Sequence, residues 1–280
     1  MRRVVLAAAV MLGAVASAQA ADMPDFLRGS LGGYSPTVNW QGFYVGGQYG
    51  YGSSDEHFGG SNGSMLSSLI ANNVIQEMGV AQWNLQLGGV STRSSGYGAF
   101  TGYNWQWDDV VAGLEASYLH GSFGGTTAAT AGPLIGGPLS DTFFHNVTVN
   151  SSDSIAISDI ATFRARAGYA YGSFLPYLFG GLALGNADIT QAVNVHDQYG
   201  PTFANAAASC SSATPPLVCY SLHSDNTLHN HLIYGYTAGL GVDIKLVGGL
   251  FMRAEWEYVR FVDLIQVNMN TVRAGLGYKF

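Results

Sequence analysis

Charged residues recur at every second position in several segments of this chain, and apolar residues lie between them. Arg164 and Arg166 follow this spacing in one segment, and Arg253, Glu255 and Glu257 follow it in another. In an extended strand, a spacing of two places the side chains on one face. The candidate set carries both signs of charge: Glu115, Arg164, Arg166, Asp243, Arg253, Glu255, Glu257 and Arg273. Such a set can form a structural network of ion pairs, or a gate whose pairs exchange to pass small ions, and we favour the network.

The two cysteines, Cys210 and Cys219, lie close together in the sequence. Export to an oxidising compartment would make a disulfide their expected state. In the chain-entropy description, closing so short a ring restrains the segment by about 2–3 kcal/mol. We therefore expect a disulfide here and no metal role.

Histidines are the remaining candidates for metal binding or catalysis. His223, His229 and His231 form a cluster in the sequence, and the last two would share one face of a strand, where they could hold a metal or haem iron. No third ligand is specified by spacing, so we favour polar side chains at a loop junction and predict no metal and no cofactor. Serines accompany His120 and His145 as well as His229, but the strained nucleophile elbow of hydrolases is absent. We expect no enzyme.

Segments that alternate between apolar and polar positions must carry these residues. In the last segment, Val272, Ala274, Leu276, Tyr278 and Phe280 fall on one face, and Thr271, Arg273, Gly275, Gly277 and Lys279 fall on the other. Eight such strands are predicted, at 42–52, 96–106, 110–121, 155–171, 175–185, 229–245, 249–261 and 267–280. The strand at 175–185 has no clear polar face, and we leave its faces unassigned.

The connections between these strands alternate in length. Short turns are predicted at 107–109, 172–174 and 246–248, whereas long loops are predicted at 53–95, 122–154 and 186–228, with a short fourth loop at 262–266. In bilayer hydrocarbon every backbone polar group must be paired, so the edges of a sheet must close on each other. The pattern predicts an all-β fold, an eight-stranded antiparallel transmembrane up-and-down β-barrel with long extracellular loops and short periplasmic turns.

The alternation also assigns the two faces of the predicted barrel. The residues expected to face lipid are apolar: Leu114, Ala116, Tyr118, Phe163, Ala165, Ala167, Tyr169, Tyr234, Tyr236, Ala238, Leu240, Val242, Ile244, Met252, Ala254, Trp256 and Tyr258. All the charged candidates fall on the opposite, lumenal face. An eight-stranded barrel is just wide enough for its own side chains, so we expect a narrow lumen and no broad pore.

The amino terminus has the features of a signal peptide at residues 1–20. Arg2 and Arg3 precede an apolar stretch at 4–15, and Ala18-Gln19-Ala20 supplies small residues for cleavage. We expect a periplasmic lead-in at 21–39 and the barrel at 40–280. After residue 21 no apolar run approaches the ~20 residues of a spanning helix, which argues against the inner membrane.

Composition narrows the possible partners. Charged residues make up 10% of the chain, the net charge is −7, and the lysines are Lys245 and Lys279. Without a basic stripe to neutralise phosphates, we expect no nucleic-acid partner. The many Gly, Tyr and Phe residues instead suit short strands with aromatic girdles.

The predicted long loops have some internal order. Residues 64–78 place Met65, Leu66, Leu69, Ile70, Val74 and Ile75 at near-helical spacing, which predicts a short amphipathic helix. It could cover the mouth of the barrel, but packing that keeps the loop compact is the favoured role. Trp83, Leu85 and Leu87, and separately Val147 and Val149, alternate in a way that could extend the sheet above the membrane.

Several short phrases resemble a known family. They are Asn39-Trp40-Gln41-Gly42-Phe43-Tyr44-Val45-Gly46, Gly98-Ala99-Phe100-Thr101-Gly102-Tyr103-Asn104, Arg164-Ala165-Arg166-Ala167-Gly168-Tyr169, Pro176-Tyr177-Leu178, Thr237-Ala238-Gly239-Leu240-Gly241, Arg253-Ala254-Glu255-Trp256-Glu257-Tyr258 and Gly275-Leu276-Gly277-Tyr278-Lys279-Phe280. In this order they resemble the small outer-membrane β-barrel proteins of alphaproteobacteria, the porin-like relatives of the OmpA transmembrane domain.

The resemblance implies a barrel in the cell outer membrane, in contact with outer-membrane lipid and lipopolysaccharide, that contributes to envelope integrity. The chain departs from the usual pattern in its long second and third loops, and no peptidoglycan-binding domain follows the barrel, so direct tethering to the cell wall is not expected. We expect a monomer with a structural role and a narrow charged lumen. The alternatives are a small-solute porin with a gated lumen, or a surface protein whose loops bind a ligand, a host molecule or haem.

Overall fold

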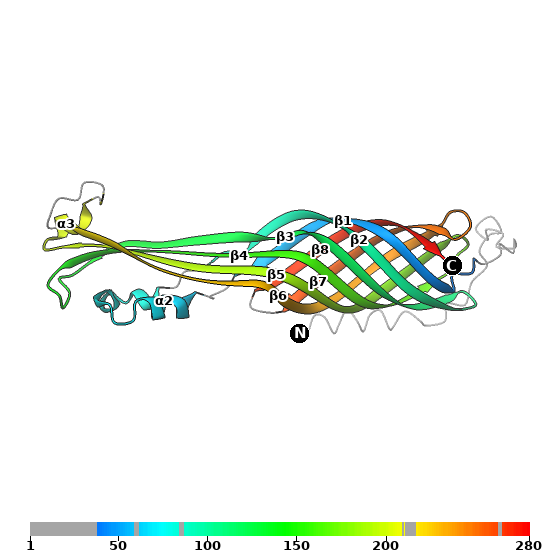
Figure 1. Ribbon diagram of the computed structural model, residues 1–280, viewed down its shortest axis with the longest axis horizontal. Coiled ribbons are helices and arrows are strands. Elements are labelled where there is room, and N and C mark those ends of the chain that lie inside the picture. The colour runs from blue at the N-terminus through cyan, green and yellow to red at the C-terminus, as the bar shows by residue number, and fades with distance from the viewer. Residues whose placement is uncertain (1–37, 59–61, 84–86, 209, 211–216, 263–264) are drawn as a thin grey trace, which may run out of the picture. The chain divides into compact units, whose positions relative to one another are not determined.

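Eight antiparallel strands close into a ring in which each strand pairs with its neighbours in sequence and β8 pairs with β1 (Figure 1). The computed structural model describes residues 38–58, 62–83, 87–208, 210, 217–262 and 265–280. The strands are β1 (Gly42–His57), β2 (Val90–Trp107), β3 (Val110–Gly136), β4 (Phe144–Tyr169), β5 (Phe174–Gly200), β6 (Val218–Lys245), β7 (Leu250–Val262) and β8 (Gln266–Lys279). The eight-stranded up-and-down barrel predicted from the alternation is therefore confirmed. The predicted signal peptide, and all but the last two residues of the predicted lead-in, lie outside the described residues.

The outer surface of the ring has the pattern that a bilayer requires. Exposed aromatic side chains lie near the short turns, among them Trp105, Trp107, Tyr169, Tyr171, Phe174 and Phe280. A second set lies toward the opposite end: Tyr49, Tyr51, Tyr97, Tyr118, Tyr234 and Tyr236. Exposed aliphatic residues such as Leu114, Leu178 and Leu240 lie between them. An apolar band flanked by aromatic girdles is typical of outer-membrane barrels. Among the described residues, no helix is long and apolar enough to span a membrane.

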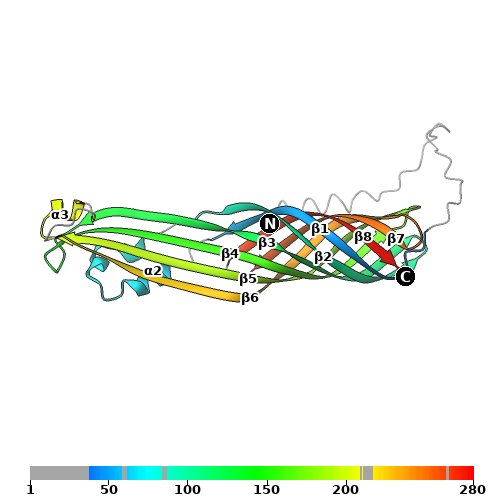
Figure 2. The same cartoon turned by 45° about the horizontal axis from the view of Figure 1, so that its top comes forward.

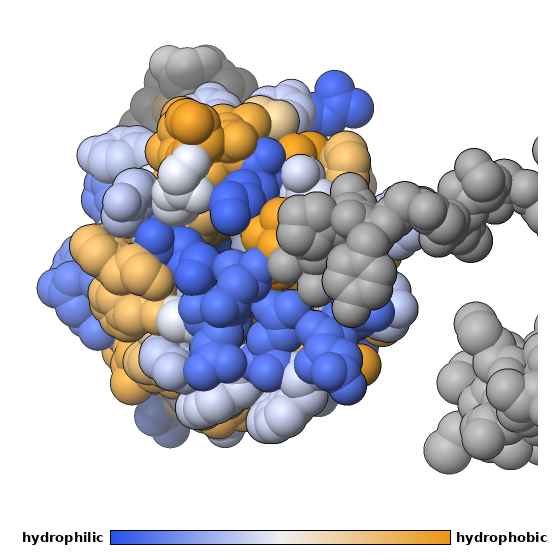
Figure 3. Space-filling view, turned by 90° about the vertical axis from the view of Figure 1, so that its right-hand side faces the viewer, coloured by the Kyte–Doolittle hydropathy of each residue, from blue (hydrophilic) through white to orange (hydrophobic). Residues whose placement is uncertain are grey.

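The end of the ring that carries the short turns is polar in its middle. Figure 3 views this end and shows hydrophilic residues gathered at the centre and hydrophobic residues around the edge. Lys245 ends β6 here, and Lys279 ends β8 and donates from Nζ to the carbonyl of Gln41 at 2.7 Å. Both lysines of the chain therefore lie at the end of the ring that carries the short turns.

Four strands continue well past the other end of the ring (Figures 1 and 2). β2 pairs with β3 only as far as Gly96 opposite Gly121, and β7 pairs with β6 only as far as Phe261 opposite Gly235. Beyond these points β3, β4, β5 and β6 pair only with one another, so they form a four-stranded sheet that we call the extension, made of 123–136, 144–157, 187–200 and 218–231.

The extension corrects the prediction of two long loops. Most of 122–154 and of 186–228 is strand. The connections between these strands shrink to 137–143 and 201–217, and the described part of the second holds the short helix α3 (Phe203–Ala207). Val147 and Val149 lie in β4, as the alternation there suggested. These segments are rich in Ser, Thr, Asn and Gly, a composition that is typical of loops. Main-chain hydrogen bonds to the neighbouring strands nevertheless stabilise them as strands, despite their low apolar content.

Bulges mark the level at which the ring passes into the extension. The β3–β4 register shifts between His120 and Phe123, and the β4–β5 register shifts between Ile157 and Asp159. The β5–β6 register shifts between Ala187 and Ile189. Bulges bend strands and increase their twist. Because the bulges lie at the same level in three neighbouring strand pairs, β3, β4, β5 and β6 bend away from the curved wall of the ring together.

The first long connection forms a small lobe against one face of the extension. It contains α2 (Gly63–Leu69) and the 3-10 helices η1 (Val74–Met78) and η2 (Val80–Gln82). The predicted helix over 64–78 is thus real in part but broken, because Asn72 adopts a left-handed φ of 69° between α2 and η1. Trp83 and Leu87 lie outside strands, contrary to the suggested sheet, and Leu85 falls outside the described residues.

Three apolar clusters fill the interior. The turn-side cluster contains Trp40, Tyr44, Phe100, Val111, Ala170, Leu175, Tyr177, Phe179 and Phe251. The mouth cluster lies toward the extension and contains Phe58, Leu87, Leu119, Phe123, Ile155, Ile157, Ile160, Ala183, Ala187, Ile189, Ile233, Val259, Phe261, Ile265, Val267 and Met269. The extension cluster joins the lobe to the sheet and contains Leu66, Ile70, Ile75, Val80, Val147, Val149, Val193 and Val195.

Candidate functional site

The eight predicted charged residues all face the inside of the ring. Each is at most 4% exposed, and they come from β3, β4, β6, β7 and β8. Their strand neighbours point outward, as the exposed Leu114, Phe163 and Trp256 illustrate. The period of two in the sequence therefore positions the whole charged set, and the closed ring brings its members together.

Glu115 is the centre of this lumen network. Arg253 donates to Glu115 from Nη1 at 2.7 Å, and Arg164 donates from Nε at 2.8 Å. Arg166 Nη1 lies 3.3 Å from the same carboxylate. The hydroxyl of Tyr44 donates a further hydrogen bond at 2.6 Å. One buried carboxylate thus receives hydrogen bonds from three arginines and one phenol, which compensates the cost of removing it from water.

The other three carboxylates complete the network. Asp243 accepts from Arg166 at 2.7 Å and from Arg253 at 2.8 Å. Glu255 accepts from Arg164 at 2.8 Å. Glu257 contacts Arg273 and also accepts from Thr237 at 2.7 Å. Four carboxylates therefore balance four guanidinium groups within one buried layer.

Aromatic side chains that the sequence did not single out complete this layer. Tyr177 donates to Glu255 at 2.6 Å, and the guanidinium of Arg166 lies 4.0 Å from the centre of its ring. Arg164 lies over Phe179 at 4.1 Å, and Arg253 lies over Phe100 at 4.0 Å. Desolvated cations over aromatic faces are stabilised by the ring quadrupole. Tyr177 and Phe179 also settle the unassigned strand, since they point inward while Leu178 is 66% exposed.

The network lies between two apolar layers. Tyr44, Phe100, Tyr177 and Phe179 belong both to its immediate surroundings and to the turn-side cluster. On the other side, Leu119 and Val259 of the mouth cluster follow Ser117 and Glu257 on the inward faces of β3 and β7. Ion pairs that are packed between apolar side chains can fill the interior of the ring in one defined arrangement. In this position the charged groups have no contact with bulk water.

His223 and His229 of the predicted histidine cluster have separate partners. His223 lies within the extension, where Nδ1 is 3.0 Å from Asn194 Oδ1 and Nε2 is 3.2 Å from Asp225 Oδ1. His229 lies 3.6 Å from Asp188, beside the left-handed Asn230 that interrupts the regular alternation before His231. Among the described residues, no group of His, Cys, Asp and Glu has the geometry to hold a metal ion.

His120 and His145, two of the histidines considered for catalysis, contact carboxylates. Ser158 donates to Asp159 at 2.6 Å, and His120 Nδ1 lies 2.8 Å from the same carboxylate, so the hydroxyl bonds the acid and not the imidazole. His145 contacts Asp197 and Asp141 through its two ring nitrogens.

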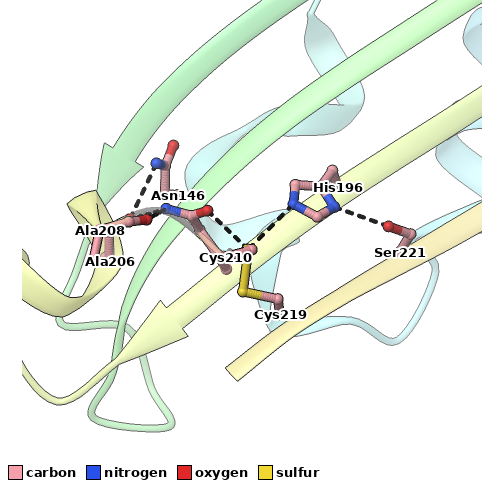
Figure 4. Close-up of a disulfide and its surroundings, with 8 residues drawn as sticks. Asn146, His196, Ala206, Ala208, Cys210, Cys219 and Ser221 are labelled. Carbon is pink, nitrogen blue, oxygen red and sulfur yellow. Dashed lines mark hydrogen bonds between the residues drawn. A yellow bond between two sulfur atoms is a disulfide. The ribbon is translucent and has the colours of Figure 1, made fainter. Parts of the chain in front are cut away.

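The disulfide between Cys210 and Cys219 is present (Figure 4). It joins the connection after α3 to the start of β6, as the spacing and the export signal predicted. Cys210 Sγ lies 3.6 Å from His196 Nε2, and His196 Nδ1 lies 2.8 Å from the hydroxyl of Ser221. The disulfide therefore ties the irregular connection to β5 and β6 at the far end of the extension.

Sequence comparison finds related proteins that are named as outer-membrane proteins. The chain is 28% identical over 196 residues to a 31 kDa outer-membrane immunogenic protein of Brucella melitensis, an alignment that covers 65% of each chain. It is 22% identical over 185 residues to a 25 kDa outer-membrane immunogenic protein of Brucella ovis, covering 65% of this chain and 62% of that one. The chain thus spans slightly less than two thirds of the length of these curated relatives.

Solved structures and a family model also match. Neisserial surface protein A aligns with a TM-score of 0.36 and 13% identity over 85% of this chain and 97% of its own. Ail of Yersinia pestis aligns with a TM-score of 0.32 and 11% identity over 85% of this chain and 99% of its own. A family model described as outer membrane protein beta-barrel domain matches residues 6–280. With its closed ring, its lipid-facing band and this match, the chain belongs to the outer membrane β-barrel domain family and is an outer-membrane protein.

Proposed function

We propose that this protein is a structural component of the outer membrane whose barrel is closed to solutes and whose extension projects from the cell surface. The observation that carries the proposal is the lumen network, in which four arginines and four carboxylates pair with each other between two apolar clusters. A barrel filled in this way serves as an anchor that also contributes to envelope integrity.

The alternative of a gated porin requires a path for water and ions through the same layer. Opening it would separate ion pairs that are almost fully buried, and a buried charge that loses its partner costs about 3–5 kcal/mol. It would also displace Phe100 and Phe251 on the turn side, where both are at most 2% exposed. The packing therefore favours a closed barrel.

The outer surface supports the proposed lipid and lipopolysaccharide contacts. Its apolar band would lie in the hydrocarbon, and the tyrosines toward the extension would reach the headgroup region. Every barrel strand already has two neighbours within the ring, so a single chain satisfies the backbone in the membrane. We therefore propose a monomer as the working unit, and surface-ligand binding through the extension as a second role.

Conductance of the refolded protein in planar lipid bilayers tests this function. We expect no discrete current steps from the wild-type protein, and none from Arg164→Glu or Glu255→Lys variants that still refold. Regular steps from the wild-type protein whose size changes in either charge-reversed variant would overturn the closed barrel and establish the gate. A variant that combines Phe100→Ala and Phe251→Ala, which thins the turn-side cluster, controls for the ability of the assay to detect an opened lumen.

A further inference from the structure

A pocket of about 340 Å³ opens near the end of the extension that lies away from the ring. Three separate segments build it: the loop between α2 and η1, the connection from β3 to β4, and the outer ends of β4, β5 and β6. Its lining residues are Asn72, Asn73, Val74, Asp141, Phe143, His145, Tyr199 and Tyr220. Pockets of ~300–1,000 Å³ commonly bind small molecules.

Aromatic rings form the walls of this tip pocket. Tyr199 lies at the centre of the group, with Phe143 edge-on at 5.6 Å and Tyr220 edge-on at 6.2 Å between ring centroids. The Asn73 amide donates to the Tyr220 hydroxyl at 2.6 Å, which fixes the ring from the side of the lobe. The rings of Phe143 and Tyr220 are inclined at 66° and 81° to the ring of Tyr199, and all three rings line the pocket.

Carboxylates lie directly beside these rings. His145, which is 2% exposed, stacks on Tyr199 with 5.0 Å between centroids, and its ring nitrogens lie 2.8 Å from Asp141 and 2.9 Å from Asp197. An imidazolium can donate to both carboxylates. With His145 protonated, the group formed by Asp141, Asp197 and His145 still has a net negative charge. Glu77 adds a further negative charge near the rim, where it accepts from the Ser140 amide at 3.1 Å.

The two acids differ in their ionisation. Burial would raise the pKa of Asp141, but hydrogen bonds from the Phe143 amide and from His145 hold it below its usual range. Burial raises the pKa of Asp197, and the contact with His145 offsets only part of this. Asp141 is therefore the carboxylate at the pocket that stays ionised over the widest range of pH.

The whole extension has the same sign of charge. In the sequence, no lysine or arginine occurs between Arg93 and Arg164, or between Arg166 and Lys245. The extension and its lobe carry Glu77, Asp141, Asp153, Asp188, Asp197 and Asp225 in these intervals and before Arg93. Charge of one sign over a surface raises the local concentration of oppositely charged ligands and increases their rate of association.

We propose that the tip pocket binds an organic cation, namely an ammonium or guanidinium group, between the rings of Phe143, Tyr199 and Tyr220 and the carboxylate of Asp141. Aromatic cages use the negative faces of their rings to hold such groups, and the adjacent acid adds direct charge pairing. Phosphate, sulfate and carboxylate ligands would meet repulsion here. The proposal goes beyond the structural role of the barrel and does not depend on whether the lumen conducts.

The test is an NMR titration of the full-length protein in uncharged detergent micelles, with ¹³C-labelled tyrosine rings as the readout. The probes are Nα-acetyl-lysine amide, its neutral Nε-acetyl form, and tetramethylammonium. We expect saturable shifts of a subset of tyrosine signals with both cations and none with the neutral form. Equal affinity of the two cations would indicate a small quaternary amine as the natural ligand, and tighter binding of the lysine derivative would indicate a basic side chain of a polypeptide.

Two pocket variants and one matched control make the test specific. Asp141→Asn and Phe143→Leu should each weaken binding of the charged probes about tenfold, the equivalent of 1.4 kcal/mol. Asp225→Asn removes the same charge from an exposed site on β6 outside the pocket lining, and it should change the affinity less than twofold. If the neutral probe binds as well as the charged one, if neither cation gives saturable shifts, or if Asp225→Asn weakens binding as much as Asp141→Asn, the proposal is wrong.

Discussion

At the scale of single residues, the lumen is organised around carboxylates that each serve several arginines. Glu115 contacts Arg164, Arg166 and Arg253, and Tyr44 is its fourth partner. Because each arginine also contacts a second carboxylate, removing one acid leaves several cations only partly compensated. The network is therefore sensitive to the loss of single members, although its net contribution to stability relative to an apolar core can be small.

Glu115→Gln should destabilise the folded barrel by about 3–5 kcal/mol, the cost of leaving buried charge without its partner. The measurement is urea-induced unfolding in lipid vesicles, followed by the shift between folded and unfolded bands in electrophoresis without heating. Asp225→Asn, which removes an exposed acid, is the control and should unfold like the wild type. Equal stability of the two variants would mean that the network can rearrange around the missing charge.

Glu56 provides a pH-dependent prediction. It lies on β1 beyond the outward-facing Tyr51, between the polar Asp55 and His57, and it is 0% exposed. Burial raises its pKa above 4.5, and a contact with Ser54 offsets part of the shift. Because the folded state holds the proton more tightly than the unfolded state, the protonated carboxyl is tolerated at low pH, and stability is lost as the pH rises from 4.5 through the folded pKa.

Glu56→Gln should therefore increase the free energy of unfolding at pH 8 and leave it nearly unchanged at pH 4. The same vesicle-based unfolding assay, run at both values, measures the difference. Asp55→Asn is a matched control, since Asp55 is the neighbouring acid on the outward face of β1. A stabilisation by Glu56→Gln that is equal at the two pH values would contradict the assignment of the effect to ionisation.

The charged members of the site could be predicted from the sequence, but their aromatic partners could not. Alternation with a period of two assigns Arg164 to the inner face of its strand and Phe163 to the outer face, because one is charged and the other apolar. The same reasoning assigns Glu255 and Trp256. Tyr44 lies between Phe43 and Val45, and Tyr177 precedes Leu178, so inward and outward residues there are both apolar or aromatic. Only the closed ring shows that Tyr44 and Tyr177 meet carboxylates from β3 and β7.

At the scale of elements, the ring strands could be predicted, whereas the extension was suggested only by the alternation at Val147 and Val149. Ring strands need a continuous lipid-facing apolar set, which is visible in the sequence. The outer part of β4 has apolar residues such as Val147 and Val149 on one face, but Asn146, Thr148 and Asn150 on the other. Asn and Thr are also common in turns and loops, so these positions did not indicate a strand. The bulges near His120 and Ile157 shift the alternation, so the outer segments also lose their register with the inner ones.

The lobe depends on the extension for its core. Leu66 of α2 is 0% exposed and packs in the extension cluster with Val147 and Val193. Leu66→Ala should cost the lobe about 2–5 kcal/mol of local stability, through lost transfer energy and the cavity left behind. Faster hydrogen exchange of the amides in 63–78, with unchanged exchange in β7 and β8, is the expected result. Ser68→Ala, at an exposed position of α2, should not accelerate exchange, because Ala favours the helix more than Ser does. Equal acceleration by both variants would show that the packing of Leu66 is not what holds the lobe.

At the scale of the whole molecule, the described chain has two separate interiors, one inside the ring and one between the extension and the lobe. The turn-side cluster, the lumen network and the mouth cluster fill the ring, whereas the extension cluster is separate and joins only the lobe to the sheet. The charges divide in a related way, since the interior of the ring holds paired arginines and carboxylates, whereas the extension carries acids without a lysine or arginine. The ring therefore has the contacts it needs for folding without the outer part of the extension.

A shortened protein tests this division directly. Replacing 63–83, 127–153 and 191–226 with short Gly-Ser turns keeps the strand pairs Thr126 with Ser154 and Thr190 with Thr227, and with them the mouth cluster. We expect this variant to refold in detergent as a barrel with β-sheet circular dichroism and a heat-dependent shift in electrophoresis. Adding Glu115→Gln should destabilise it as much as it destabilises the full chain, because distant, independent sites are additive within about 0.5 kcal/mol. A shortened chain that fails to refold would mean that the extension forms part of the folding unit of the ring, since all residues of the lumen network are retained.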